Sequence, residues 1–305
     1  MPCLGKPLNH INTLVLCCEL ILVICYNTTK RKNKEVRMEI IHGLIKKMRQ
    51  TIMDHHYRIG EKLAGRYIIK KLLQNGSYGI IYLCWDLEAN QKCVVKQMRK
   101  SKQKESEENY IEETTILAQL DHPAIPKLIE TFEYQANHFF AMEFIEGKNI
   151  EDALFASKHK YSEKECVELT KKLITIVCYI HNNGVIHGDL RIPNVLLHNG
   201  ELFVIDFGLA HNLHADEMAK VHQTQLHQED FFDIGEFLLF LLYSSYQGET
   251  KKNRAWTEEL HLHPKTTAML KRLLQINTPY EQCEPILADV DEVLRDMAED
   301  NSAAK

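Results

Sequence analysis

The hydrophobic pattern of the chain changes near residues 143–150, and this change limits the folds that the chain can adopt. Before it, short runs of β-branched and aromatic residues alternate with turns and predict strands and one helix. The strands span 66–74, 79–87, 92–98 and 138–145, and the helix spans 104–120. Beyond residue 150, apolar residues recur at helical spacing and predict helices at 165–183, 229–245 and 266–275. A β-rich part joined to a helical part makes the fold class α+β, with a seam that favours a ligand.

Composition excludes several classes of protein. The chain has 305 residues, is 45% hydrophobic and 26% charged, and carries a net charge of −5, which gives no reason to expect a nucleic-acid partner. Its nine cysteines form no C-x-x-C pair and most lie in apolar contexts. We therefore expect reduced cysteines in a cytoplasmic protein, without a disulfide framework or a zinc site.

The first 60 residues differ from the rest. Residues 11–26 are mostly apolar and are followed by a basic stretch, which is typical of a membrane anchor that holds the remainder on the cytoplasmic side. The run is short for a span and contains a glutamate. Residues 38–53 predict an amphipathic helix that packs on its own domain. The alternative to an anchor is an over-long gene start, with the methionine at either end of that helix as the first residue.

Carboxylates stand between apolar runs in the segment 185–208, VIHGDLRIPNVLLHNGELFVIDFG. The runs VLL and LFVI predict buried strands, and carboxylates beside buried strands are costly without a positive partner. Magnesium bound to nucleotide phosphates would supply that partner, because carboxylate and amide oxygens suit Mg²⁺. Asp189 precedes Asn194 by five residues, so one short loop can hold the first at a substrate hydroxyl and the second at a metal. Asp206 ends the following strand near the same point.

Two features of the β-rich part fit the same ligand. Gly76 and Gly79 in QNGSYG lie between two predicted strands, where their backbone amides can face phosphate oxygens, although a plain hairpin turn explains the pair equally well. Lys96 ends an otherwise apolar strand and needs an anionic partner or solvent. Glu113 lies on the helix that follows, either facing the sheet or on a solvated face.

Over roughly residues 60–297 the chain resembles the protein kinase family, in particular its small, trimmed, bacterial-type Ser/Thr members. LLQNGSYGIIY resembles the glycine-rich loop, CVVK the strand with the phosphate-positioning lysine, AMEFIEG the hinge, HGDLRIPN the catalytic loop and DFG the metal loop. Asp230 in DFFDIG resembles the aspartate that braces the catalytic loop. The resemblance implies a bilobal fold with a β-rich N-lobe at 61–145, a mostly helical C-lobe at 146–300, and the cofactors ATP and Mg²⁺.

The resemblance also implies roles for individual residues. Lys96 would hold the α- and β-phosphates and pair with Glu113, and Asn194 and Asp206 would bind Mg²⁺. Asp189 would accept the hydroxyl proton, and Arg191 would steady the γ-phosphate. The remaining contacts to ATP would come from Leu73, Gln74, Asn75, Gly76, Ser77, Tyr78, Gly79, Ile81, Val94, Met142, Glu143, Ile145 and Leu196.

The chain departs from the family pattern in ways that bear on regulation. Gln74 replaces the first glycine of the loop, and Val94 replaces an alanine above the adenine, which narrows that pocket. Gly188 replaces the arginine that normally pairs with a phosphate on the activation loop, and the interval after Gly208 is short and lacks an APE motif. We therefore expect no control by activation-loop phosphorylation. The four histidines of that interval, at positions 211, 214, 222 and 227, are read as solvated, with a metal or pH sensor as the alternative.

Three functions remain open at this point. The first is ATP-dependent phosphorylation of Ser/Thr hydroxyls of a protein substrate. The second is a small-molecule kinase acting on a sugar, aminoglycoside or similar acceptor, because HGD with a glycine and a lost APE occur in such relatives. The third is a non-catalytic nucleotide-binding scaffold, which the retained catalytic groups argue against.

Overall fold

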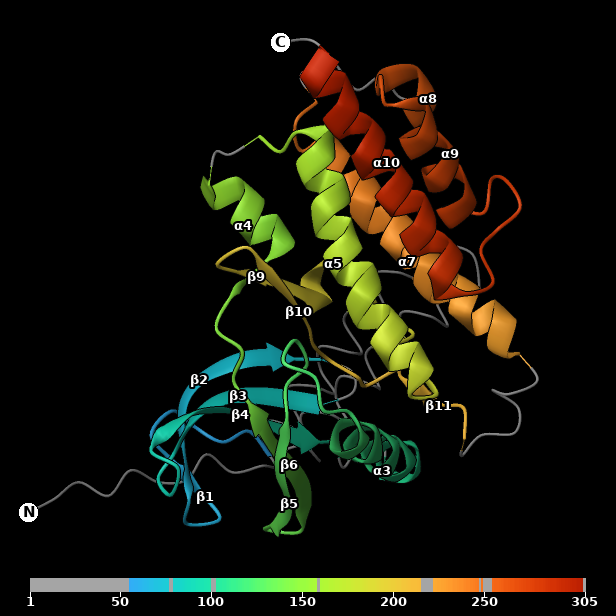
Figure 1. Ribbon diagram of the computed structural model, residues 1–305. Helices are drawn as coiled ribbons and strands as arrows, with labels where there is room; N and C mark the ends of the chain where they lie inside the picture. Colours follow the sequence, from blue (N-terminus) through green and yellow to red (C-terminus); the bar gives the residue numbers. More distant parts are fainter. Residues whose placement is uncertain are drawn as a thin grey trace, which may run out of the picture.

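The computed structural model describes residues 55–76, 79–99, 103–157, 160–214, 222–246, 248 and 254–303 (Figure 1). The segments 11–26 and 38–53 lie outside these residues. Their interpretations as anchor and amphipathic helix therefore stay predictions. Among the described residues, no helix combines the length and the apolar character needed to cross a membrane.

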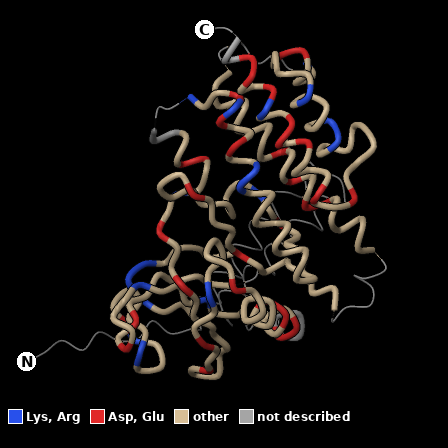
Figure 2. Tube along the Cα trace, in the orientation of Figure 1, with Lys and Arg blue, Asp and Glu red and all other residues tan. Residues whose placement is uncertain are grey.

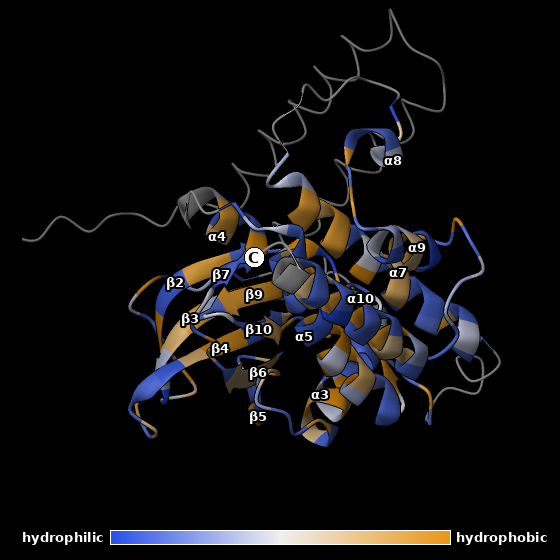
Figure 3. Ribbon diagram, turned by 45° about the horizontal axis from the view of Figure 1, so that its top comes forward, coloured by the Kyte–Doolittle hydropathy of each residue, from blue (hydrophilic) through white to orange (hydrophobic). Residues whose placement is uncertain are grey.

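The N-terminal part is an antiparallel six-stranded sheet in the order β1-β2-β3-β4-β6-β5. Its strands are β1 (Lys62–Leu63), β2 (Tyr67–Asn75), β3 (Gly79–Asp86), β4 (Gln91–Met98), β5 (Leu128–Tyr134) and β6 (Asn137–Glu143). β4 lies centrally and is buried from Cys93 to its end, because one face meets an aromatic cluster and the other meets the helices. Figure 3 shows hydrophobic residues along β3 and β4. The four predicted strands are confirmed.

Helix α3 (Gln103–Gln119) packs beside this sheet and confirms the helix predicted at 104–120. Its residues Ile116 and Leu117 are buried in the core, whereas Ile111 is 57% exposed, so the apolar positions of the sequence do not all face the sheet. The position of α3 relative to the rest of the protein is fixed at its C-terminal end. The Gln119 side chain donates to the carbonyl of Asn183 at 2.6 Å and accepts from the amide of Asn212 at 3.0 Å.

The C-terminal part is mostly helical. Its helices are α4 (Ile150–Ser157), α5 (Glu163–Asn182), α7 (Gln223–Tyr243), α8 (Trp256–Glu259), α9 (Pro264–Leu273) and α10 (Cys283–Ala303). α5, α7 and α10 lie side by side (Figure 1). α5 begins with a capping box in which Ser162 and Glu165 satisfy each other's backbone amides. The predicted helices at 165–183, 229–245 and 266–275 are confirmed.

Short strands connect the two parts. β7 (Lys148–Asn149), β9 (Val195–His198) and β10 (Glu201–Val204) form one small sheet in the order β10-β9-β7, and β8 (Val185–Ile186) pairs with β11 (His211–Asn212). β9 and β10 confirm the strands read from VLL and LFVI, although only Val195, Leu202 and Val204 of them are fully buried. Acidic and basic residues are interspersed over both lobes (Figure 2). A single hydrophobic cluster runs from Val94 on β4 to Val293 on α10, and this shared core fixes the seam between the lobes.

Candidate active site

Lys96 is the centre of a buried group of charges between the lobes, which we call the Lys96 centre. Its side chain is 2% exposed, and Nζ lies 2.6 and 2.8 Å from the two carboxylate oxygens of Glu113. Nζ also lies 3.3 Å from Oδ1 of Asp206. The three residues come from β4, α3 and the turn after β10. The predicted pairing of Lys96 with Glu113 is therefore present, and Asp206 joins it.

The electrostatics of the Lys96 centre favour the charged forms of Lys96 and Asp206, whereas burial raises the pKa of Glu113 despite the neighbouring Lys96 ammonium. Burial alone would lower the pKa of Lys96, but the Glu113 and Asp206 carboxylates outweigh burial, so its pKa lies above the ordinary value. Burial likewise opposes ionisation of Asp206, yet the Lys96 ammonium and the Gly208 backbone amide hold the pKa of Asp206 below its ordinary value. An ammonium with two carboxylates carries a net negative charge, which a divalent cation between Asp206 and phosphate oxygens would balance.

Close packing leaves little room for a side chain at Gly208, two residues after Asp206. A Cβ atom at Gly208 would lie 3.1 Å from Nζ of Lys96 and 3.2 Å from Oδ1 of Asp206. Asp206 itself has a backbone φ of 64°, in the left-handed region. The turn therefore projects the Asp206 carboxylate toward Lys96, and Gly208 leaves room for the ammonium.

Asp230 on α7 is the centre of a second buried group, which we call the Asp230 centre. Its side chain is fully buried and accepts hydrogen bonds from the backbone amides of His187 at 3.0 Å and Gly188 at 2.8 Å. Nε2 of His181 on α5 lies 2.7 Å from Oδ2 of Asp230, the same oxygen that accepts from the His187 amide. Burial opposes ionisation of Asp230, but these partners hold its pKa below the ordinary value. The loop that carries Asp189 is thus tied to α7, as the sequence comparison with DFFDIG predicts.

The backbone at Gly188 excludes any larger residue in this conformation. Gly188 has φ 71°, and a Cβ atom there would lie 2.6 Å from the carbonyl oxygen of Leu209. The glycine at position 188 therefore has a second consequence besides the absence of the family's arginine. The loop follows a path that only glycine can take without strain.

Asp189, Arg191 and Asn194 are brought together at the exposed side of this loop. Arg191 donates from Nε to Oδ1 of Asp189 and from Nη2 to Oδ2 at 2.9 Å. The Asn194 amide donates to the Asp189 carbonyl and to its Oδ2, both at 2.9 Å. The Asp189 side chain is 15% exposed, so part of it is open to solvent. Asp189, predicted to meet the acceptor hydroxyl, is held in one orientation by two neighbours.

The oxygen donors fit a hard divalent cation. The Asn194 amide nitrogen is used by Asp189, so its carbonyl oxygen Oδ1 faces no donor among the described residues. Oδ2 of Asp206 likewise has no hydrogen-bond donor in the described part of the chain. One amide and one carboxylate oxygen suit Mg²⁺, which keeps few protein ligands. In the same described residues there is no cluster of three or more His, Cys, Asp or Glu side chains that would hold another metal.

The predicted nucleotide contacts lie around the seam. Val94 pairs with Met142 across β4 and β6, and Ile81 pairs with Lys96 across β3 and β4. Gly76 closes the β2–β3 turn by donating from its backbone amide to the carbonyl of Gly79 at 3.0 Å. Ser77 and Tyr78 lie outside the described residues. Leu73 and Gln74 lie on β2, Asn75 ends it, Glu143 ends β6, Ile145 follows in the connection between the lobes, and Leu196 lies on β9.

The interpretation of the four histidines as solvated is wrong for His227. That residue lies within α7, and its ring stacks on the ring of His181 with centroids 4.2 Å apart. Burial, followed by the neighbouring His181, lowers the pKa of His227 to about 4. His214 and His222 are exposed, and His211 is partly exposed on β11. The sequence placed the start of this helix at residue 229, six residues too late, because 223–228 contains few apolar residues.

Sequence reasoning missed two residues that position the catalytic loop. Asp233 on α7 accepts from the backbone amide of Leu190 at 2.9 Å, and His181 contacts Asp230. Both had a signal. Asp233 follows Asp230 by three residues and so shares its helix face, and His181 is a polar residue on the apolar face of α5.

Comparison with known proteins agrees with this geometry. A family model described as "Protein kinase domain" matches residues 67–228. "Probable serine/threonine-protein kinase YbdM" of Bacillus subtilis is 38% identical over 253 residues, covering 82% of this chain and 98% of that relative. "Probable serine/threonine-protein kinase 2" of Plasmodium falciparum is 31% identical over 156 residues, and "Calcium-dependent protein kinase 10" of Arabidopsis thaliana is 32% identical over 156 residues. These matches cover 50% and 49% of this chain, but only 30% and 28% of the two longer relatives.

Proposed function

The chain belongs to the protein kinase family, and we propose that it transfers phosphate from ATP to serine and threonine hydroxyls of a protein substrate. Protein kinases in general use ATP and a divalent metal, and the relative that this chain covers almost completely carries the name of a Ser/Thr kinase. The observation that carries the proposal is the convergence of Lys96, Glu113 and Asp206 beside Asp189 and Asn194.

The roles that we propose for these residues follow from their contacts. Lys96 is fixed by Glu113 and presents its ammonium to the α- and β-phosphates of ATP. Asn194 and Asp206 would hold Mg²⁺, which when bound neutralises phosphate charge. Asp189 orients the acceptor hydroxyl and accepts its proton, and Arg191 steadies the γ-phosphate from the exposed side. Positioning and charge stabilisation account for most of the catalysis in such a site.

The adenine end of the site is proposed on strand geometry. The glycine-rich loop, from Leu73 to Gly79 and including Ser77 and Tyr78, would cover the phosphates. Ile81, Val94 and Leu196 would enclose the adenine, and Met142 would line the back of its pocket. Backbone groups of Glu143 and Ile145 would bind the adenine edge. The lobes would divide between residues 145 and 146, where the connection leaves β6 and no element has yet begun.

The proposed kinase needs no phosphorylation of its activation loop. Gly188 leaves no arginine to receive such a phosphate, and α3 is already held by Gln119 against Asn183 and Asn212. Glu113 therefore faces Lys96 without a further ligand. Cytoplasmic location follows from the reduced cysteines and stays part of the proposal, as does attachment to the cytoplasmic side of a membrane through residues 11–26.

The test is phosphate transfer from labelled ATP with Mg²⁺, comparing the full chain with Asp189→Ala. The acceptors are the protein itself, a generic basic protein and a mixture of small metabolites. We expect label on protein serine or threonine, and a loss of at least about 100-fold in the variant. Glu229→Gln serves as the control, because among the residues that the structure describes this exposed α7 carboxylate contacts Gln225 alone. Label on small acceptors alone would replace the proposal with a small-molecule kinase, and ATP binding without transfer would replace it with a scaffold.

A further inference from the structure

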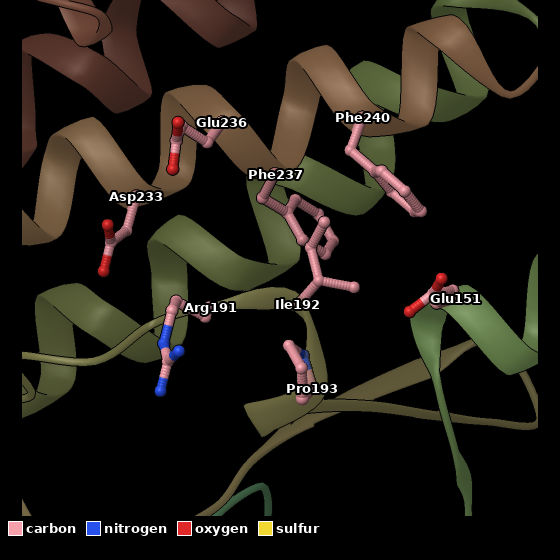
Figure 4. Close-up of a pocket in the computed structure, with 8 residues that line it drawn as sticks. All are labelled: Glu151, Arg191, Ile192, Pro193, Asp233, Glu236, Phe237 and Phe240. Carbon is pink, nitrogen blue, oxygen red and sulfur yellow. The ribbon is translucent and has the colours of Figure 1, made fainter. Parts of the chain in front are cut away.

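Arginines from both lobes hold loops of the candidate site, but their surroundings differ. Arg191 extends from the catalytic loop, which passes beside α7 (Figure 4), and its 68% exposed side chain binds Asp189 in the same loop. Arg99 follows the last residue of β4 and is only 4% exposed. Two of its partners lie 23 and 24 residues away along the chain, in the glycine-rich loop.

Arg99 binds the glycine-rich loop at two points. Its Nε donates to the carbonyl oxygen of Gly76 at 2.7 Å, and its Nη2 donates to Oδ1 of Asn75. The planar guanidinium fixes the directions of both donors, which a lysine ammonium does not do. The backbone amide of Gly76 donates in turn to the carbonyl of Gly79 at 3.0 Å. The amide and the carbonyl of Gly76 are therefore both engaged, although glycine has the greatest backbone freedom of all residues.

The sheet alone holds this end of the β2–β3 hairpin weakly. β2 is exposed from Lys70 to Asn75. Its pairing with β3 shifts register at two places between Ile69 and Gln74, where the ladder is interrupted. Segments with few buried contacts open easily. A buried arginine that binds the end of the hairpin therefore has a large influence on the conformation of the loop.

The hairpin also meets the residue that is proposed to bind phosphate. Lys96 precedes Arg99 by three residues, and a Cβ atom at Gly79 would lie 3.3 Å from Cγ and Cε of Lys96. A backbone carbonyl turned toward phosphate would repel it, whereas backbone amides attract it. Because Arg99 binds the Gly76 carbonyl, this oxygen is directed toward a buried cation, and the amides of the loop can face the phosphates.

We propose that Arg99 is a positioning residue for the phosphates of ATP: it holds Asn75 and the Gly76 carbonyl so that the glycine-rich loop presents its amides to phosphate, without touching the nucleotide itself. The inference rests on the proposed function, because it adds a residue to the same nucleotide site. Arg99 should therefore affect ligands that carry phosphates and leave the binding of adenosine alone unchanged.

The experiment measures the Kd of the full chain for Mg·ATP and for adenosine by isothermal titration calorimetry, together with KM and kcat of phosphate transfer. Arg99→Ala should raise Kd and KM for ATP by about ten-fold, since two hydrogen bonds from a charged group are lost. Its Kd for adenosine should stay within about two-fold of wild type and its kcat within about three-fold, because the loop supplies binding common to the ground and transition states. Arg58→Ala, at an exposed arginine of the same lobe, is the control and should change none of these values.

Two further variants separate orientation of the loop from charge and from stability. Arg99→Lys keeps the charge but cannot bind both acceptors in the same geometry, so its Kd for ATP should rise by about five-fold. Asn75→Ala removes one acceptor and should raise the Kd for ATP by about three-fold in wild type, with no further increase in Arg99→Ala. If Arg99→Ala does not fold, the same double-mutant cycle is measured with Arg99→Lys.

The possible results distinguish the inference from the proposed function. Equal losses of ATP and adenosine binding in Arg99→Ala would overturn the inference, because they would indicate a general disturbance of the lobe. Full ATP affinity in Arg99→Lys would overturn it as well, since charge alone would then suffice. Either result leaves the proposed function standing. ATP binding without phosphate transfer in wild type would overturn the proposed function while the Kd comparison still tests Arg99, and absence of ATP binding would overturn both.

Discussion

The two buried charged centres satisfy their carboxylates by opposite means. In the Lys96 centre, Glu113 and Asp206 face a charged ammonium, and the three residues come from both lobes. In the Asp230 centre, the carboxylate accepts from two backbone amides and faces His181, and all of these groups belong to the C-lobe. Lys96, Glu113 and Asp230 are all buried, so burial alone does not distinguish the roles of the two centres.

The type of partner does distinguish them. Lys96 interacts with three carboxylate oxygens through charge, and phosphate oxygens can join or replace these contacts without rebuilding the fold. Asp230 is held by amides of the loop itself, so any change in its contacts moves the backbone at Asp189. We infer that the Lys96 centre acts on ligand and that the Asp230 centre sets the geometry of the catalytic loop.

Removing the Asp230 carboxylate is expected to have the largest effect. Asp230→Ala leaves the buried amides of His187 and Gly188 without their acceptor and removes the oxygen that Nε2 of His181 contacts. We expect a loss of about 3–5 kcal/mol in the free energy of unfolding and no measurable phosphate transfer. Urea unfolding monitored by circular dichroism measures the first, and labelled ATP measures the second. Asp152→Ala, at an exposed site on α4, is the control. A stability within about 0.5 kcal/mol of wild type would mean that Asp230 is not the brace.

In the Lys96 centre, a second substitution is expected to recover the stability that the first one removes. Lys96→Met leaves Glu113 buried without its cation and should cost about 3 kcal/mol of stability. Adding Glu113→Leu removes the stranded carboxylate and should recover most of that loss. Transfer should fall by at least about 100-fold in both variants, because no ammonium meets the phosphates. If the double variant recovered activity together with stability, this would contradict a role of Lys96 in binding the phosphates.

A substitution at Gly188 tests whether the loop path is built into the backbone. Gly188→Ala forces a side chain into a left-handed backbone conformation, with its Cβ atom 2.6 Å from the Leu209 carbonyl oxygen. We expect a loss of about 2 kcal/mol in the free energy of unfolding and a fall in kcat, since the Gly188 amide also bonds to Asp230. Gly188→Arg, which restores the family residue, should be no better than alanine. An arginine variant with wild-type stability and kcat would show that the loop has another path available.

The sequence predicted the parts of the fold that depend on local pattern. β2, β3, β4 and β6 were found from their β-branched runs, and α5 from its apolar face. β5 was not predicted, because its sequence LIETFEY mixes apolar and polar residues and none of its residues is fully buried. α10 was not named either, since its acidic residues dilute the apolar repeat.

The site divides in a similar way. The pairing of Lys96 with Glu113 followed from the ordered motifs, but contacts between distant segments did not. Only the fold brings His181 to Asp230, Asp233 to the Leu190 amide, or Arg99 to the Gly76 carbonyl. The strained path at Gly188 was read from sequence as the loss of an arginine, because backbone dihedral angles leave no trace in a single sequence.

The smallest predicted effect is a pH dependence of stability that is caused by His227, next to the Asp230 centre. Its ring lies against His181, whose Nε2 contacts Asp230, and burial lowers the pKa of His227 to about 4. In the unfolded chain a histidine titrates near about 6.5. Between these values the unfolded state binds the extra proton, so stability should fall as pH decreases from about 6.5 toward about 4.

Comparison of variants isolates this contribution. Because its pKa is raised to about 6, Asp233 contributes to the pH dependence of stability with the opposite sign over an overlapping pH range. Asp233 is present in every protein compared, so its contribution cancels. Between pH 7.5 and 5, wild type should lose about 1 kcal/mol more than His227→Gln, a figure reduced because the ring is only partly buried. Urea unfolding at both pH values measures the difference, with His261→Gln, at an exposed histidine, as the control. The same pH dependence in wild type and His227→Gln would show that this ring can be charged at no cost, and that the Asp230 centre is isolated from the pH of the solvent.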